Sequence, residues 1–471
     1  MIGKWLKILF TILLVSMFFF PFEFKAFLGQ NTKNLMAALG LVFIFMTFVL
    51  KGNLIIPREL IVLLFLSGIV SLVSFVAVVY NQTPDYSYVT YIRAAVIWLS
   101  AAYVASMVIW MVHGYIDVKL VVNYIVAVCV FQCVMAMVME FIPAVKDFVN
   151  AYVEQGQDLL EDINRLYGIG ASLDVGGSRF AVALVAIAAL VDAEIKEMKV
   201  YEIVLYSIAF IIITVVGNMI ARTTIIGVLL AFVYIVVKFL GNFLKGGSGY
   251  GKLLGAIVMV LLVMVPVAVT LYNTFPEVKD LMRFGFEGFF SYFEEGEFET
   301  TSTNKLQTMV VFPEDMKTWI IGDGYFENSR NDVNYLGDAT TQGFYMGTDI
   351  GYLRFIFYGG IFLVIAMSAV IIYAGVICMH KYPDYKYIFI LAILVNMIVW
   401  LKVATDIFLF FCLFITAFVI HETLDDPEED EEDEEDEDWE WDDEDEDEDE
   451  DEEDEQPETV ENPEKIPVAE L

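Results

Sequence analysis

Long apolar stretches alternate with short polar connections over the first 421 residues of the chain. A transmembrane helix needs about 20 predominantly apolar residues to cross the roughly 30 Å of hydrocarbon in a bilayer. Twelve stretches approach this length, at residues 5–22, 34–50, 60–80, 89–112, 119–141, 179–195, 201–219, 223–240, 253–274, 351–379, 386–402 and 405–421. The pattern predicts an all-α, polytopic helical membrane protein with about twelve transmembrane helices over residues 1–421.

Basic residues are distributed unevenly among the loops that join these stretches. If the N-terminus is cytoplasmic, the cytoplasmic loops hold Lys4, Lys7, Lys51, Arg58, Lys119, Lys196, Lys199, Lys238, Lys245, Lys252, Lys381 and Lys386. The short outer turns then hold only Lys25, Lys33, Arg222 and Lys402. Because Lys and Arg are enriched in short cytoplasmic loops, both termini are predicted to be cytoplasmic.

Two loops are much longer than the connections usual in helical bundles, which have about 2–8 residues. They cover residues 142–178 and 275–350, and both follow odd-numbered helices, so both are predicted to be extracytoplasmic. Residues 144–166 carry apolar side chains at helical spacing among acids. This spacing favours an amphipathic helix lying on the membrane domain, where it is suited to act as a lid.

Composition separates a second region from the membrane domain. The chain of 471 residues is 58% hydrophobic with a mean hydropathy of +0.64, which excludes an ordinary soluble enzyme. Its net charge of −37 arises mainly in residues 422–471, which hold 33 of the 64 acids. Such a polyacidic segment repels itself and cannot bury a core, so this cytoplasmic tail is predicted to be disordered. It is interpreted as a solvating tail, or else as a docking segment for a basic partner or a weak divalent-ion site anchored by Trp439 and Trp441.

The cysteines add no further chemistry. All four fall inside apolar stretches, where a thiol behaves as a small hydrophobe, at Cys129, Cys133, Cys378 and Cys412. We expect no disulfide, no metal, no cofactor and no nucleic-acid partner.

Charged groups near the ends of the apolar stretches are the candidate functional residues, because a charge at membrane depth costs about 2.5–3.5 kcal/mol. On the predicted outer side, Arg179 opens the sixth helix, Arg222 lies between the seventh and eighth, and Arg354 opens the tenth. Each alone is compatible with snorkelling to the interface or with pairing to an acid. Guanidinium groups stay charged and bind phosphate oxygens in pairs, so the three together favour a site for an anionic ligand. The candidate supporting residues are Arg93, Lys402 and Tyr352.

The second long loop carries short glycine-containing motifs. Ile-Gly-Asp-Gly-Tyr-Phe lies at residues 321–326, Gly-Thr-Asp-Ile-Gly-Tyr-Leu-Arg at 347–354 and Tyr-Gly-Gly-Ile at 358–361. The glycines permit tight turns. Asp349 directly precedes the tenth helix, where it serves either as a helix N-cap or as a functional carboxylate five residues before Arg354.

These motifs resemble those of the O-antigen polymerase (Wzy-type) and O-antigen ligase superfamily, as do Gly-Ser-Arg-Phe at 177–180 and Ala-Arg-Thr-Thr at 221–224. The resemblance covers residues 1–421 and excludes the acidic tail. It implies a GT-C-like, metal-independent glycosyltransferase in the cytoplasmic membrane of a bacterium. Donor and acceptor would be oligosaccharides on undecaprenyl diphosphate. The product would be a surface polysaccharide, such as O-antigen of lipopolysaccharide, capsule or exopolysaccharide, with its chain length set by a separate regulator.

The resemblance also implies roles for individual residues. Three arginines would hold the diphosphate leaving group: Arg179, Arg222 and Arg354. The acceptor hydroxyl would attack the anomeric carbon with inversion, while a base takes or orients its proton. Asp349 is the first candidate for this base, with Glu327 and Asp323 in reserve.

Two further patterns bear on the branch of the superfamily. Ligases are associated with a histidine in the large outer loop, whereas the histidines of this chain, His113, His380 and His421, map to cytoplasmic helix ends. A polymerase-associated pattern, an arginine separated by ten residues from a glycine, occurs once, from Arg165 to Gly176. Such a loose spacing also arises by chance, so the histidines carry more weight, and they favour the polymerase.

Proteins of other classes fit the pattern less well. A transporter of lipid-linked oligosaccharide or solute usually shows internal repeats and charges near the midplane, whereas this sequence shows no internal repeat and has its charges at the outer ends. A peptidoglycan glycosyltransferase of the shape-and-division type usually has fewer helices, and nothing in residues 1–421 supports a receptor. The polymerase is therefore the prediction, with a ligase-like enzyme or a transporter as the alternative.

Overall fold

The computed structural model describes residues 2–25, 30–52, 56–156, 160, 165–244, 251–328 and 343–424. These residues belong to one compact unit, Met1–Asp425. The acidic tail from residue 425 onward, with Trp439 and Trp441, lies outside the described residues, so the prediction of disorder stays a prediction.

The described part of the chain is almost entirely helical, and nine of its helices are long and apolar enough to cross a membrane. They are α2 (Thr32–Lys51), α3 (Arg58–Asn81), α4 (Tyr91–His113), α5 (Val118–Phe141), α8 (Leu173–Glu194), α9 (Val200–Ile220), α10 (Thr224–Leu244), α11 (Gly251–Thr274) and α16 (Gly351–Lys381). The protein is therefore a polytopic helical membrane protein, as predicted.

The three remaining predicted spans are also helical but do not reach the same length. They are α1 (Ile2–Phe19), α17 (Lys386–Val399) and α18 (Phe408–Leu424), with 18, 14 and 17 residues. A full span needs about 20 helical residues. Each of the twelve apolar stretches thus coincides with a helix, while the number that cross the bilayer stays a prediction.

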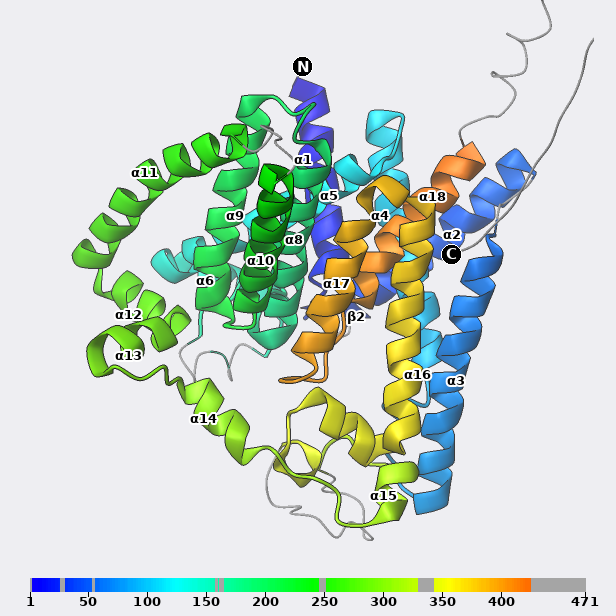
Figure 1. Ribbon diagram of the computed structural model, residues 1–471. Coiled ribbons are helices and arrows are strands. Elements are labelled where there is room, and N and C mark those ends of the chain that lie inside the picture. Colours follow the sequence, from blue (N-terminus) through cyan, green and yellow to red (C-terminus); the bar gives the residue numbers. More distant parts are fainter. Residues whose placement is uncertain are drawn as a thin grey trace, which may run out of the picture. The chain divides into compact units, whose positions relative to one another are not determined.

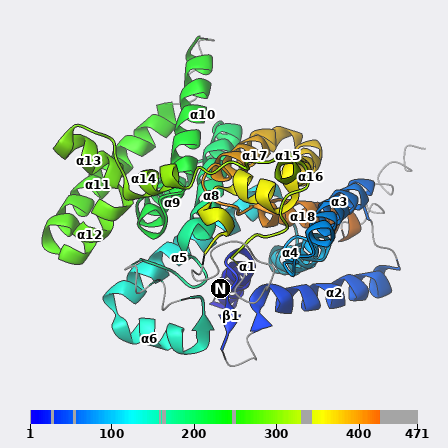
Figure 2. The same cartoon turned by 90° about the horizontal axis from the view of Figure 1, so that it is seen from below.

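Helix α8 lies inside the unit, in contact with α5, α9, α10 and α17 (Figures 1 and 2). Small residues permit this close packing. A Cβ added at Gly177 would lie 2.9 Å from the Cβ of Ala221, and one added at Gly227 would lie 2.4 Å from the backbone of Ala181. The prediction that this helix starts at Arg179 is wrong: it starts at Leu173, because its first turns are glycine-rich and polar and therefore carry no hydropathy signal.

The first long loop contains a short helix and a small sheet. Helix α6 (Pro143–Tyr152) confirms the start of the predicted amphipathic helix. The helix does not continue to residue 166, because strand β3 (Val153–Glu154) pairs instead with β1 (Glu23–Phe24), which pairs in turn with β2 (Gln30–Asn31). Residues 157–159 and 161–164 of this prediction lie outside the described residues.

The second long loop is mostly helical where it is described. It contains α12 (Pro276–Gly285), α13 (Glu287–Glu295), α14 (Thr301–Thr308), α15 (Met316–Ile320) and the turn η1 (Tyr345–Gly347). A further turn, η2 (Pro383–Tyr385), joins α16 to α17. Helices α8, α10 and α16 begin at the same end of the unit, each after a long loop or after the turn at Arg222 (Figure 1). We call this end the "loop end".

Helix α16 is interrupted at Gly359 and Gly360, which do not have helical backbone angles. Gly360 has φ +70°, a value that favours glycine, and a Cβ there would lie 2.1 Å from the carbonyl oxygen of Ile320 in α15. The break therefore lets α15 pack directly against the backbone of α16, which anchors the second long loop at the loop end.

Replacing Gly360 with alanine should lower the free energy of unfolding by about 1–3 kcal/mol, because the left-handed φ is strained for alanine and the added Cβ meets Ile320. Thermal denaturation of the detergent-solubilised protein measures the effect. Gly255→Ala in α11 is the matched control, since a Cβ there meets nothing within 4 Å. Equal melting temperatures for the two variants would contradict the prediction.

Candidate functional site

A pocket of about 170 Å³ opens at the loop end, between the starts of α8 and α10 and the second long loop. Its lining includes four basic residues, Arg165, Arg222, Lys305 and Lys402, and two acids, Asp174 and Asp349. The excess of positive charge makes it a candidate anion site. Residues from five separate parts of the sequence meet here, so only the folded chain forms the pocket.

Arg222 and Arg165 both contact the ring of Phe284 in α12. Their guanidinium carbons lie 4.1 and 4.0 Å from the ring centroid, within the range of a cation–π interaction. Arg222 also pairs with Glu287 and donates to the hydroxyl of Ser302 at 3.4 Å. Burial lowers the pKa of Arg222 and of Arg165 from its usual value, so each positive charge is only partly compensated by the protein. A bound anion would stabilise both charges.

Lys402 joins three helix ends. It lies in the turn between α17 and α18, and its Nζ is 2.6 Å from a carboxylate oxygen of Asp174 in α8 and 2.9 Å from the hydroxyl of Thr223 before α10. Thr223 also donates to Asp174. Lys402 therefore lies in the pocket lining, and its contacts hold one wall of the pocket together; its supporting role stays a prediction.

Asp349 contributes a carboxylate to the same pocket. It is not a helix N-cap, because Ile350 occupies the cap of α16 and no side chain there bonds to the helix. Its Oδ1 lies 3.5 Å from a terminal nitrogen of Arg354. Burial raises the pKa of Asp349 to about 6, although the charge of Arg354 opposes the rise. A carboxyl group with this pKa can accept a proton near neutral pH.

Arg354 positions this carboxylate and lies behind the pocket. Its guanidinium is held between the rings of Phe326 at 3.5 Å and Phe344 at 4.3 Å, and it donates to the carbonyl oxygen of Phe326 at 3.0 Å. The side chain is only 6% exposed. Arg354 is thus fixed on several sides and is placed to orient Asp349.

Arg179 lies apart from Arg222 and Arg354. It is 6% exposed, its guanidinium carbon is 5.6 Å from the ring of Phe20, and its Nε has no hydrogen-bond partner. It lines a different pocket, with Glu23, Glu154 and Gly170. The three arginines predicted to act together therefore do not line one pocket.

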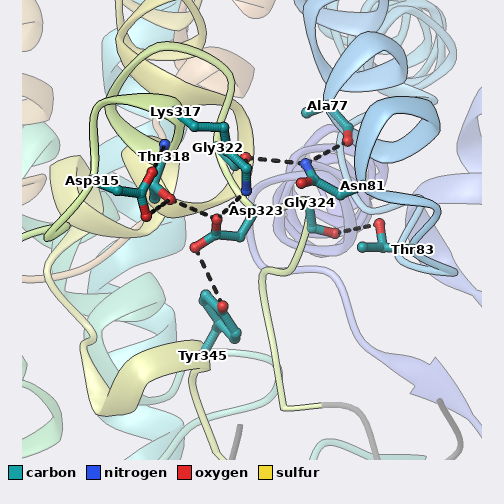
Figure 3. A network of polar contacts seen from close by, with 10 residues as sticks. All are labelled: Ala77, Asn81, Thr83, Asp315, Lys317, Thr318, Gly322, Asp323, Gly324 and Tyr345. Carbon is teal, nitrogen blue, oxygen red and sulfur yellow. Dashed lines mark hydrogen bonds and ion pairs between the residues drawn. The ribbon is translucent and has the colours of Figure 1, made fainter. Parts of the chain in front are cut away.

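Asp323 forms contacts within the second long loop (Figure 3). Its carboxylate accepts from Lys317 at 2.6 Å, from the hydroxyl of Thr318 at 2.7 Å and from the hydroxyl of Tyr345 at 3.3 Å. It does not line the basic pocket. The contacts fit a structural role for this reserve candidate.

The glycines on either side of Asp323 attach this loop to the end of α3 (Figure 3). Asn81 donates to the carbonyl oxygen of Gly322 at 3.0 Å, and Thr83 donates to that of Gly324 at 2.8 Å. Both glycines have positive φ, and a Cβ on Gly322 would lie 2.5 Å from the backbone of Tyr358. The Gly-Asp-Gly-Tyr motif therefore serves close backbone packing that positions the residues following it.

The other predicted residues lie outside the basic pocket. Glu327 is exposed and lines a third pocket beside Phe326. Tyr352 donates to the carbonyl oxygen of Met397 at 3.0 Å, and Arg93 is exposed on α4. Neither contributes to the pocket lining.

Several residues of the pocket were not among the predicted site residues. Arg165 carried one signal, its spacing from Gly176, and it lies in the pocket lining. No sequence signal identified Asp174, Lys305 or Glu287, the partner of Arg222, because they are ordinary polar residues in loops or helix starts. Their role follows only from the contacts that the folded chain makes.

No family model, curated protein or solved structure matches this chain. The resemblance of its motifs to O-antigen polymerases therefore stays a prediction, and the chemistry of the site has to follow from its own side chains. Those side chains can bind an anion through fixed positive charge and can accept a proton at Asp349. Both capacities meet in a single pocket.

Proposed function

We propose that this protein is a polyprenyl-diphosphate-dependent glycosyltransferase that polymerises undecaprenyl-diphosphate-linked oligosaccharide repeat units into a surface polysaccharide. The pocket at the loop end carries this proposal, because four basic residues and a carboxyl group with a pKa of about 6 line the same cavity. Transfer of a glycan from a lipid diphosphate needs positive charge where the leaving group becomes more negative. It also needs a group that takes the proton of the attacking hydroxyl.

The proposed reaction uses the two sides of the pocket for different tasks. The acceptor hydroxyl attacks the anomeric carbon, a new glycosidic bond forms, and the bond from that carbon to the diphosphate oxygen breaks with inversion. Asp349 takes the hydroxyl proton. Arg354 orients the Asp349 carboxylate through the 3.5 Å contact between them. Arg222, Arg165 and Lys402 stabilise the departing diphosphate. Arg179, which lines another pocket, is not part of this set.

The proposal places the loop end on the outer face of the cytoplasmic membrane of a bacterium, with twelve spans in a GT-C-like arrangement and both termini inside. The unequal distribution of Lys and Arg supports this orientation. The short helices α17 and α18 are compatible with spanning, since the turn between them, at Lys402, lies at the loop end with Asp174.

The positions of the histidines support a polymerase over a ligase-like enzyme. His113 and His380 lie in the last turns of α4 and α16, and His421 in the last turn of α18. These helices begin at or near the loop end, so the three histidines lie at their opposite ends. A histidine-dependent reaction at the pocket is not supported by this arrangement.

Deleting the gene and separating the cell's surface glycans on a gel tests the proposal. A polymerase predicts loss of the polymer ladder, with single repeat units left on the lipid or its final anchor, and recovery with the wild-type gene. Polymer that accumulates without reaching its final anchor would favour a ligase-like enzyme. An unchanged ladder in a strain with no second polymerase would contradict both and favour a transporter.

The pH dependence of polymerisation should follow Asp349. Its pKa of about 6 is raised above the usual carboxyl value, so the base is ionised above this pH and protonated below it. We expect the initial rate to be constant above about pH 6 and to fall about tenfold per pH unit below it. Rates measured in proteoliposomes across this range check the expectation. If the residual rate of Asp349→Asn still shows the inflection near pH 6, that inflection belongs to another group.

A further inference from the structure

A third pocket, of about 330 Å³, lies at the loop end between α4, α18 and the second long loop. Its volume is at the lower end of the roughly 300–1,000 Å³ usual for small-molecule sites. Its lining includes five aromatic residues and two acids: Tyr88, Tyr91, Trp98, Phe326, Phe408, Glu327 and Asp406. No lysine or arginine occurs among its described lining residues, although Lys33 Nζ lies 4.8 Å from the ring centroid of Trp98, so the pocket lining is less basic than that of the basic pocket.

The hydroxyl of Tyr91 has no partner. The residue is only 8% exposed, and the hydroxyl oxygen is buried without a hydrogen bond. A buried polar group that lacks a partner costs about 1–3 kcal/mol. Tyr91 also lines the pocket, so a hydroxyl-bearing ligand that reaches this oxygen would supply the missing hydrogen bond.

The aromatic walls are held rigidly. The ring of Tyr88 is stacked with that of Tyr91 at a centroid distance of 6.2 Å and meets the ring of Phe326 edge-on at 5.1 Å. Trp98 meets Phe18 edge-on at 5.7 Å. Fixed aromatic faces with a polar atom at one end fit ligands that have an apolar face and polar edges. A pyranose ring has this character, since its C–H groups form flat faces and its hydroxyls project from the edge.

The carboxylates decide which ligands fit. Glu327 is exposed at the pocket, and Asp406 accepts a hydrogen bond from the backbone N–H of Phe408 at 3.0 Å. Ionised carboxylates accept hydrogen bonds from hydroxyl and amide groups. The exposed carboxylate of Glu327 disfavours phosphate and uronic acids. Asp406 is half-buried, and burial raises its pKa although the charges of Arg179 and Lys33 oppose the rise. The two carboxyl groups also make the pocket unfavourable for a purely apolar polyprenyl chain.

Phe326 connects this pocket with the proposed reaction centre. Its ring lines the pocket, and Arg354 lies 3.5 Å from the ring centroid while contacting Asp349 at 3.5 Å. One aromatic side chain and one guanidinium therefore separate the aromatic pocket from the proposed base. A glycan whose diphosphate end or reacting hydroxyl lies in the basic pocket has its next sugar rings within reach of the aromatic pocket.

We propose that this aromatic pocket is a subsite for a neutral sugar ring of the lipid-linked glycan, bound by stacking on Trp98 and Tyr88 and by hydrogen bonds to Tyr91 and Glu327. The assignment rests on the proposed glycosyltransferase function and adds the part of the substrate that is recognised. It also predicts that the bound sugar is a hexose or an N-acetylhexosamine and carries no acidic group.

Two measurements on the full-length protein in phosphatidylcholine nanodiscs test the subsite. The first is calorimetric binding of phosphate-free single repeat units, released by mild acid from the cell's own surface polysaccharide. The second is the initial rate of polymerisation as a function of lipid-linked repeat unit. Tyr91→Phe and Glu327→Gln should each raise both the dissociation constant and KM about three- to tenfold, with kcat within about twofold of wild type.

The matched control for Tyr91→Phe is Tyr86→Phe, which removes an exposed hydroxyl outside the pocket. The matched control for Trp98→Phe is Trp110→Phe, which lies toward the other end of α4. Both controls should bind as wild type does, and Trp98→Phe should bind more weakly. Melting temperatures verify that each variant is folded.

The outcomes separate the two proposals. Wild-type protein that binds the free repeat unit through Tyr91 but forms no polymer would overturn the polymerase and leave the sugar site standing. If the wild-type protein forms polymer, and both Tyr91→Phe and Glu327→Gln leave the dissociation constant and KM unchanged, the subsite alone would be overturned. Failure of wild-type protein to bind the free repeat unit would also overturn it.

Discussion

Replacing Arg222 with alanine should abolish the polymer ladder and lower kcat by about 10²- to 10³-fold. Arg222 lines the basic pocket, where its guanidinium contacts Glu287, Ser302 and the ring of Phe284. A guanidinium that stabilises the departing diphosphate acts mainly in the transition state, where the charge on the leaving group is greatest. The loss should therefore appear in kcat as well as in KM.

The measurement is the rate of polymer formation in proteoliposomes, alongside complementation of the deletion strain. Arg283→Ala is the matched control, because Arg283 is on the neighbouring α12, is 40% exposed and pairs with Glu294 away from the pocket. Arg222→Lys should recover part of the rate, since it restores the charge but not the paired N–H groups. A normal ladder with Arg222→Ala would remove the basic pocket from the mechanism.

Replacing Asp349 with asparagine should lower kcat by about 10²- to 10⁴-fold, the usual contribution of a general base. Asparagine keeps the size of the side chain but cannot take a proton. The lipid-linked substrate should still bind, because Arg222 and Lys402 remain in place. We therefore expect KM to change little while kcat falls.

Asp280→Asn is the control for this variant, because Asp280 is an exposed carboxylate of α12 outside the pocket lining. It should leave the rate unchanged. Full polymer length in cells that carry only Asp349→Asn would show that another group takes the proton. The remaining rate of Asp349→Asn should also lack the inflection near pH 6. Loss of a merely structural role would lower the rate without removing this inflection.

The glycine motifs illustrate how far local sequence can be interpreted. Gly-Asp-Gly-Tyr and Tyr-Gly-Gly-Ile indicated tight turns, and the structure gives positive φ at Gly322, Gly324 and Gly360. The reason for these turns was not evident from the sequence. Each glycine lies against the backbone or side chain of a segment distant in the sequence, at Tyr358, Thr83 or Ile320.

Arg179 and Arg165 show the limit for the site itself. Both are arginines at the end or edge of an apolar segment, and the sequence favoured Arg179 because it adjoins a span. The extra turns at the start of α8 place Arg179 in a separate pocket, whereas the path of the first long loop brings Arg165 to Phe284. Neither outcome follows from the residues near each arginine.

The sequence by itself determined that this protein crosses a membrane with many helices, because the length and hydrophobicity of each apolar run are local properties. It also identified Arg222, Asp349 and Lys402 as candidates, because charges beside apolar runs are costly and therefore conspicuous. Only the tertiary structure decided which charges share a pocket, which carboxylate is buried enough to have a pKa near 6, and where an aromatic pocket lies beside it. Those properties depend on distances and burial among segments far apart in the chain, and such distances exist only after the helices have packed.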